Sequence, residues 1–125
     1  MQDEPTPIEL IKAVSDFLRS EIAPAISGHN AFKLRVSINA LNLVTRQLAL
    51  EQASDAAEAA RLTELLGLRG PLGELNRALA DRIASGEADL QTPGLAEHLW
   101  QTTLAKLAVD QPNYAAYKRE LERKR

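Results

Sequence analysis

One segment, from about Ala31 to Glu51, constrains the fold more than any other part of the sequence. Its apolar side chains cover most of the circumference of a helix and leave a single polar stripe. The stripe consists of Arg35, Asn39, Asn42 and Arg46, which fall within about 60° of one another at about 100° per residue. A helix that is apolar over so much of its surface is usually central to a fold. We therefore expect a core helix whose two arginines face solvent, acids or a bound anion.

The beginning of this segment also carries a strand-like pattern. Apolar and polar residues alternate from Phe32 to Ile38. No turn residue separates this run from Leu41 and Leu48, whose spacing is helical, and no second strand-like run is available to pair with it. The segment therefore favours one long helix over a strand.

Helix-start and helix-stop signals divide the rest of the chain into further helices. Thr6, Pro7 and Glu9 form a capping-box start, and Pro24 bends or ends the helix that follows. Further helices are expected from Ser54-Asp55 to about Leu66, where Gly67 ends the helix, from Gly70-Pro71 to Gly86, from Thr92-Pro93 to about Val109, and from the start signal Asp110-Gln111-Pro112-Asn113 to near the C-terminus. The sequence predicts an all-α fold, a single-domain antiparallel bundle of five to six helices over residues 1–125, with flexible ends at 1–5 and about 122–125.

Charge and composition exclude several classes of function. The formal net charge is −2 and charges of both signs are interspersed, which argues against nucleic-acid binding because that function needs a basic surface. The chain has no cysteine, which suits the cytoplasm. No apolar run approaches the roughly 20 residues that span a bilayer, and the acidic N-terminus does not resemble a signal peptide. We expect a cytoplasmic protein with no nucleic-acid and no membrane partner.

The sequence contains no complete catalytic or metal-binding motif. The two histidines, His29 and His98, lie outside metal-binding spacings and are expected at the surface. No nucleophile elbow and no phosphate-binding loop is present. We therefore predict no catalytic residue, no metal and no cofactor. An enzyme that used a tyrosine or aspartate as acid or base would need a pocket, which a sequence does not show.

Two groups of polar residues are candidate ligand contacts. In the stripe, Arg35 and Arg46 lie about 16 Å apart along the helix axis, a separation that suits an extended anion such as a nucleotide or a coenzyme A moiety. The stripe equally fits a solvent-facing seam or ion pairs with acids on other helices, and these alternatives stay open. The second group consists of Lys106, Asp110, Tyr114 and Tyr117. It would join the stripe if the last helix packs on the second. Otherwise Asp110 caps the last helix and the tyrosines pack at the surface.

Residues along nearly the whole chain resemble an uncharacterised bacterial family of small all-helical domains. They are Arg35-Val36, Asn39, Leu41, Val44, Arg46 and Leu48 in the centre, Lys106-Leu107-Ala108, Asp110, Pro112, Tyr114 and Tyr117 near the end, and also Pro5-Thr6, Glu9-Leu10 and Leu75-Asn76-Arg77-Ala78-Leu79. In that family an acid commonly follows the second arginine, whereas Gln47 stands here. This departure weakens any mechanism that relies on such a carboxylate.

The resemblance implies a genomic context rather than an activity. Members of the family are often encoded beside aminoglycoside-phosphotransferase-like kinases and acyl-CoA dehydrogenases, which are therefore the expected partners. We expect a non-catalytic accessory or interaction domain associated with a phosphotransferase-like enzyme. The alternative is a binding module that holds an acyl-CoA or another phosphorylated small molecule through the Arg/Asn stripe. A homodimer is also expected, because a short Leu/Ala bundle leaves one apolar face uncovered.

Overall fold

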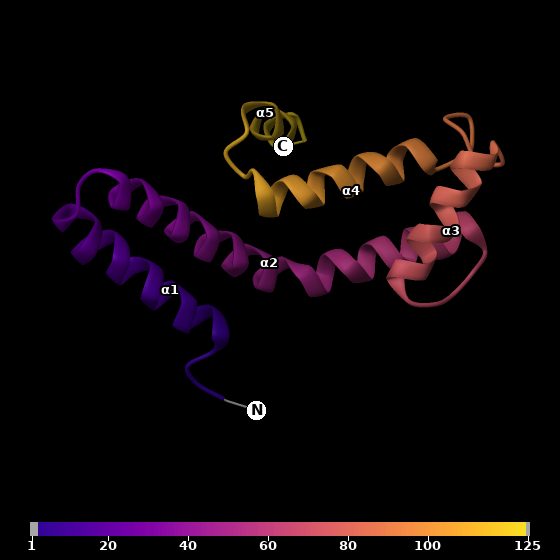
Figure 1. The fold of residues 1–125 in the computed structure, drawn as a ribbon. Helices are drawn as coiled ribbons and strands as arrows, with labels where there is room; N and C mark the ends of the chain where they lie inside the picture. Colours follow the sequence, from indigo (N-terminus) through magenta and orange to yellow (C-terminus); the bar gives the residue numbers. More distant parts are fainter. Residues whose placement is uncertain (1–2, 125) are drawn as a thin grey trace. The chain divides into compact units, whose positions relative to one another are not determined.

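The computed structural model describes residues 3–124 (Figure 1). It contains the helices α1 (Pro7–Phe17), α2 (His29–Leu66), α3 (Leu72–Ser85), α4 (Leu95–Asp110) and α5 (Ala115–Arg123). No strand occurs among these described residues. The all-α prediction and the predicted number of helices are therefore confirmed. Of the ends predicted to be flexible, Met1, Gln2 and Arg125 lie outside the described residues.

Helix α2 is one element where the sequence analysis expected two. It runs for 38 residues through Ser54 and Asp55, which were predicted to begin a separate helix, so that prediction is wrong. Serine and aspartate favour a helix start only where the preceding chain leaves the helical conformation. No glycine or proline stands between Gly28 and Gly67, and the stretch from Glu51 to Ala60 is rich in alanine, the strongest helix former. The helix therefore continues without a break.

The chain divides into two compact units, Met1–Leu50 and Glu51–Arg125, and each is described by itself below. Unit 1 pairs α1 with the first part of α2 in an antiparallel hairpin (Figure 1). Helix α1 begins with the predicted capping box, because Thr6 Oγ1 accepts from the Glu9 N–H at 3.2 Å and Glu9 Oε2 accepts from the Thr6 N–H at 2.8 Å. Among residues 3–50, the buried side chains are those of Ile38 and Ser15. A two-helix unit therefore has only a thin core.

The chain leaves α1 through two irregular turns before Gly28. A π-helical turn spans Leu18–Ile22 and a 3-10 turn spans Ala23–Ala25. Pro24 lacks a backbone N–H and its ring clashes with the carbonyl four residues earlier, so it cannot extend an α-helix. The prediction that Pro24 bends or ends the first helix is confirmed, and the disturbance reaches back to Leu18.

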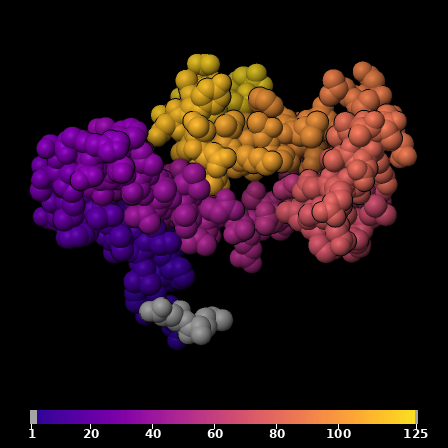
Figure 2. All heavy atoms as spheres, viewed as in Figure 1, coloured from indigo at the N-terminus to yellow at the C-terminus, as the bar shows by residue number. Residues whose placement is uncertain are grey.

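Unit 2 has a continuous aliphatic core between the second part of α2, helix α3 and the start of α4. Its buried residues are Leu62, Leu66, Leu75, Leu79, Ala88 and Leu95. The atoms of α3 and of the end of α2 form one closely packed group in Figure 2. Gly67 ends α2 with φ 68° and Gly86 ends α3 with φ 84°, as their predicted helix-stop roles require. An Arg82 guanidinium nitrogen donates to the Leu66 carbonyl at 3.0 Å, which satisfies an acceptor at the C-terminal end of α2.

The last two helices begin later than the sequence signals indicated. Helix α4 begins at Leu95, with Gly94 at the N-cap, rather than at Thr92-Pro93. Asp110 is the last residue of α4, and Tyr114 takes the N-cap position of α5, so the predicted capping role of Asp110 is wrong. Helices α4 and α5 meet where Trp100 Nε1 donates to Glu120 Oε1 at 3.4 Å. Among residues 3–124, no helix combines the length and the apolar character needed to cross a bilayer.

The continuity of α2 predicts the effect of a proline at position 55. In Asp55→Pro, the ring clashes with the Glu51 carbonyl and a helical hydrogen bond is lost, so we expect the free energy of unfolding to fall by about 3 kcal/mol. Urea unfolding followed by far-UV circular dichroism measures this change.

Asp55→Ala is the matched control, because it removes the same exposed carboxylate without disturbing the backbone, and it should change stability by less than about 1 kcal/mol. If a separate helix began at Ser54, a proline at its first position would be tolerated. Equal stability of the two variants would therefore contradict the continuous helix.

Candidate functional site

The polar stripe of Arg35, Asn39, Asn42 and Arg46 lies on α2 within unit 1. Its residues differ in exposure: Arg35 and Asn39 are exposed, whereas Asn42 and Arg46 are half-buried. The stripe is therefore neither a uniform solvent-facing seam nor a uniformly buried row.

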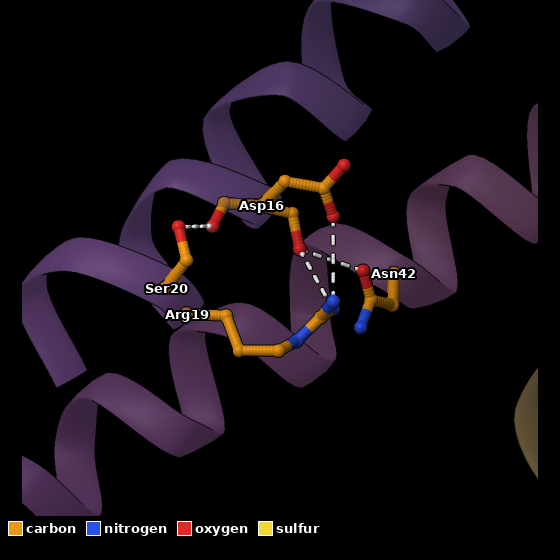
Figure 3. A network of polar contacts seen from close by, with 5 residues as sticks. Asp16, Arg19, Ser20 and Asn42 are labelled. Carbon is orange, nitrogen blue, oxygen red and sulfur yellow. Dashed lines mark hydrogen bonds and ion pairs between the residues drawn. The ribbon is translucent and has the colours of Figure 1, made fainter. Parts of the chain in front are cut away.

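Asn42 is engaged in the packing of α2 against α1. Ser15 is 1% exposed, and its hydroxyl donates to Asn42 Oδ1 at 2.8 Å. Figure 3 shows this bond beside the Arg19 guanidinium, which lies 3.3 Å from Asp16 Oδ1 and 3.5 Å from the Ser15 hydroxyl. A buried hydroxyl needs a partner, and the Asn42 amide supplies it. This member of the stripe has a structural role that a ligand would have to displace.

The second predicted group lies in unit 2, at the end of α4 and on α5. Lys106, Asp110 and Tyr114 are exposed and Tyr117 is half-buried. Tyr114 and Tyr117 stand at the start of α5, three residues apart, and therefore share a face of that helix. The stripe and this group belong to different units. Ligand binding by the stripe or by the second group stays a prediction. A ligand site formed by the two groups together also stays a prediction.

A polar cluster that the sequence analysis did not single out lies between α2 and α4 in unit 2. His98 is 2% exposed, and its Nδ1 accepts a hydrogen bond from Arg61 Nε at 3.1 Å. A terminal nitrogen of the same guanidinium donates to Thr102 Oγ1 at 3.3 Å. Arg61 forms no ion pair with any carboxylate in the described part of the chain. The half-buried Arg61 guanidinium therefore donates to two neutral acceptors, His98 and Thr102.

This hydrogen bond fixes the protonation state of His98. A guanidinium can only donate, so Nδ1 must be unprotonated and the imidazole is neutral with its proton on Nε2. Burial, followed by the nearby Arg61 charge, lowers the pKa of His98 below its ordinary value of 6.5, while Glu58 acts in the opposite direction. The prediction that His98 lies at the helix surface is wrong. Its spacing of three residues from the buried Leu95 is the signal that places it on the inner face.

A cavity of about 560 Å³ adjoins the cluster, entirely within unit 2. Its walls come from the end of α2, the loop before α4 and the first turn of α4. They are formed by Arg61, Glu64, Leu65, Thr92, Pro93, Gly94, Glu97 and His98. Gly94 has φ 85°, and a Cβ there would approach Leu65 Cδ2 to 3.3 Å, so the wall is tight at this point.

Hydrogen-bond donors and apolar side chains lie together at the cavity. No group of three or more metal-ligating side chains occurs in residues 3–124. Arg61 and His98 together offer hydrogen-bond donors beside an apolar wall at Leu65 and Pro93. Neutral His98 has its basic nitrogen occupied by Arg61, which leaves it no free lone pair for proton abstraction.

Comparison with known proteins defines the class of this chain. The family described as Domain of unknown function (DUF6285) matches residues 24–114, which spans all of α2, α3 and α4 together with the cavity. The chain belongs to this family of domains of unknown function. No curated protein and no solved structure matches the chain.

The lowered pKa of His98 predicts a pH dependence of stability. The unfolded chain binds a proton at His98 near pH 6.5, whereas the folded chain does so only at lower pH. Between the folded and unfolded pKa values of His98, the unfolded chain binds more protons than the folded chain. The contribution of His98 to the free energy of unfolding is therefore complete above pH 6.5 and decreases as the pH drops toward the folded pKa. Urea unfolding across this range measures the slope, and proton NMR of the imidazole measures the pKa.

His29 provides the matched control because it is exposed. We expect His98→Gln to remove most of the stability slope between pH 6.5 and the folded pKa, and His29→Gln to leave it in place. A folded-state pKa of His98 at or above 6.5 would contradict the account of the cluster given above.

Proposed function

We propose that this chain is a non-catalytic interaction domain that acts in the cytoplasm and binds a phosphotransferase-like enzyme. The observation that carries the proposal is the apolar surface left open on unit 1. The resemblance noted from the sequence supplies the candidate partner, and an acyl-CoA dehydrogenase is the second candidate.

Helix α2 exposes a row of large apolar side chains. Phe32, Val36, Leu43 and Leu50 fall within about 40° of one another on the helix surface, and their exposed fractions are 55%, 52%, 36% and 41%. Ile38, which is buried, projects from a different side of the helix. Four exposed side chains in one row form the kind of surface that a partner helix or groove covers.

Helix α1 carries a second apolar row. Leu10, Val14 and Phe17 are spaced by four and three residues and so share one face. All three are about half exposed. Both helices of unit 1 therefore present apolar side chains to the outside, although its core contains little more than Ile38. Burial of these rows against a partner would supply apolar contact that unit 1 lacks by itself. A second copy of the chain would cover the same surface in a homodimer.

Substitution of the α2 row separates binding from folding. In the triple variant Phe32→Gln, Val36→Gln and Leu43→Gln, the helix propensity is kept while the apolar surface is removed. We expect partner binding to weaken at least about tenfold, since central apolar anchors dominate interface energies. Titration of the purified phosphotransferase-like enzyme from the same genome, by calorimetry at micromolar concentration, measures this change.

Lys33→Gln and Gln47→Ala are the control variants, because both residues are exposed on the same helix outside the row. They should bind like the wild type. Absence of binding to either candidate enzyme by the wild-type chain would refute the proposed partner. If the wild type is a dimer, the triple variant is a monomer and neither binds an enzyme, the apolar row serves self-association instead.

The Arg/Asn stripe supports a second candidate function, the binding of an acyl-CoA or another phosphorylated small molecule. Arg35 and Asn39 are exposed, which leaves their side chains accessible to a ligand. We expect an acyl-CoA to raise the melting temperature of the wild type, since binding to the native state alone stabilises it. Arg35→Ala should lose this rise and Lys33→Ala should keep it. A rise that is equal in all three proteins would exclude the stripe as the binding site.

A further inference from the structure

We propose that the cavity beside Arg61 and His98 binds a small monocarboxylic acid with an apolar body. This inference does not depend on the interaction proposed for unit 1, because the cavity and every residue that lines it belong to unit 2.

The first argument is that Arg61 forms no ion pair with any residue that the structure describes, although Glu64 and Glu97 line the same cavity. Its guanidinium is half-buried, and two of its five N–H groups are used on His98 and Thr102, neither of which is an acid. Cations at such positions are normally paired, because removal of a charge from water is costly. A carboxylate in the cavity would provide the missing counter-ion through the remaining N–H groups.

The second argument is an unused donor on a side chain that is almost fully buried. The Nε2–H of His98 donates no hydrogen bond within the described residues. Among residues 3–124, every fully buried side-chain nitrogen or oxygen has a hydrogen-bond partner. Since Nε2 has none, this atom is not fully buried and must border accessible space. His98 is 2% exposed and lines the cavity, which is the accessible space beside it. Its Nε2–H is therefore a fixed donor for a ligand oxygen.

The N-terminus of α4 adds to the positive electrostatic potential in the cavity. Gly94 stands at the N-cap and no side chain caps the first turn. The N–H groups of that turn carry the positive end of the helix dipole, which favours an anion near them. Gly94 and Glu97 both line the cavity, so this helix start borders the same space as Arg61.

The acids of the cavity limit the charge of the ligand. Glu64 and Glu97 also line it, and Glu97 Oε1 accepts from Gln101 Nε2 at 2.7 Å. Because these two carboxylates outnumber the one guanidinium, they repel a phosphate ester with two negative charges more strongly than they repel a ligand with a single negative charge. Leu65 and Pro93 supply an apolar wall for the rest of the molecule. The cavity volume lies within the range of about 300–1,000 Å³ that is typical of small-molecule sites.

Thermal melting of the full chain with straight-chain acids tests this inference. The probes are butanoate, hexanoate and octanoate, each compared with its primary amide and with inorganic phosphate. We expect an acid at about tenfold its Kd to raise the melting temperature by about 5 °C. The amide has the same shape without the charge and should give no rise, and phosphate should give a smaller one.

Variants locate the binding. Arg61→Gln should abolish the rise, whereas Arg69→Gln, at an exposed arginine of the same unit, should retain it. Since Arg61→Gln could also unfold the chain, a second measurement uses the wild type. A bound carboxylate that accepts from His98 Nε2–H should raise the pKa of that imidazole and shift its NMR signals, which the amide should not do. No rise with any acid, an equal rise with amide and acid, or an unchanged rise in folded Arg61→Gln would overturn the proposal.

Discussion

The absence of any helix-breaking residue between Gly28 and Gly67 is the constraint on which the rest of this structure depends. Because no glycine or proline interrupts the segment, α2 passes from unit 1 into unit 2 as a single helix. Its first part holds Asn42 against Ser15, and its second part brings Leu62 and Leu66 into the aliphatic core and Arg61 to His98. With a break near Ser54, these two sets of contacts would lie on two separate helices instead of one.

The sequence predicts the local features of the fold better than the distant ones. The capping box at Thr6 and the helix stops at Gly67 and Gly86 were predictable because each depends only on neighbouring residues. The continuity through Ser54 was missed because capping residues are also tolerated inside a helix when the alanines around them favour it. The role of His98 was missed because its partner lies 37 residues away on another helix. Spacing from buried leucines can indicate the inner face, but it cannot name the group that meets the imidazole there.

Unit 1 shows why an amphipathic pattern does not by itself produce a core. Two helices can cover only one side of each other, so most of their apolar side chains have no counterpart. Ile38 is buried, whereas Phe32 and Val36 on the same helix and Phe17 on α1 keep more than half of their surface exposed. The sequence analysis expected the segment from about Ala31 to Glu51 to be a core helix. In the structure its apolar side chains include the buried Ile38 and an exposed row at Phe32, Val36, Leu43 and Leu50.

Arg82 provides an internal comparison for Arg61. Both are half-buried arginines of unit 2. The Arg82 guanidinium donates to the Leu66 carbonyl at 3.0 Å and lies 3.9 Å from Glu87, so its place is explained by the end of α2 and by a nearby acid. Arg61 ends no helix and has a neutral imidazole where an acid would be expected. A purely structural residue at this position could be a neutral donor, which would satisfy His98 without the cost of a partly buried charge. No ion pair within the described part of unit 2 accounts for the positive charge of Arg61, and the anion proposed for the adjoining cavity would account for it.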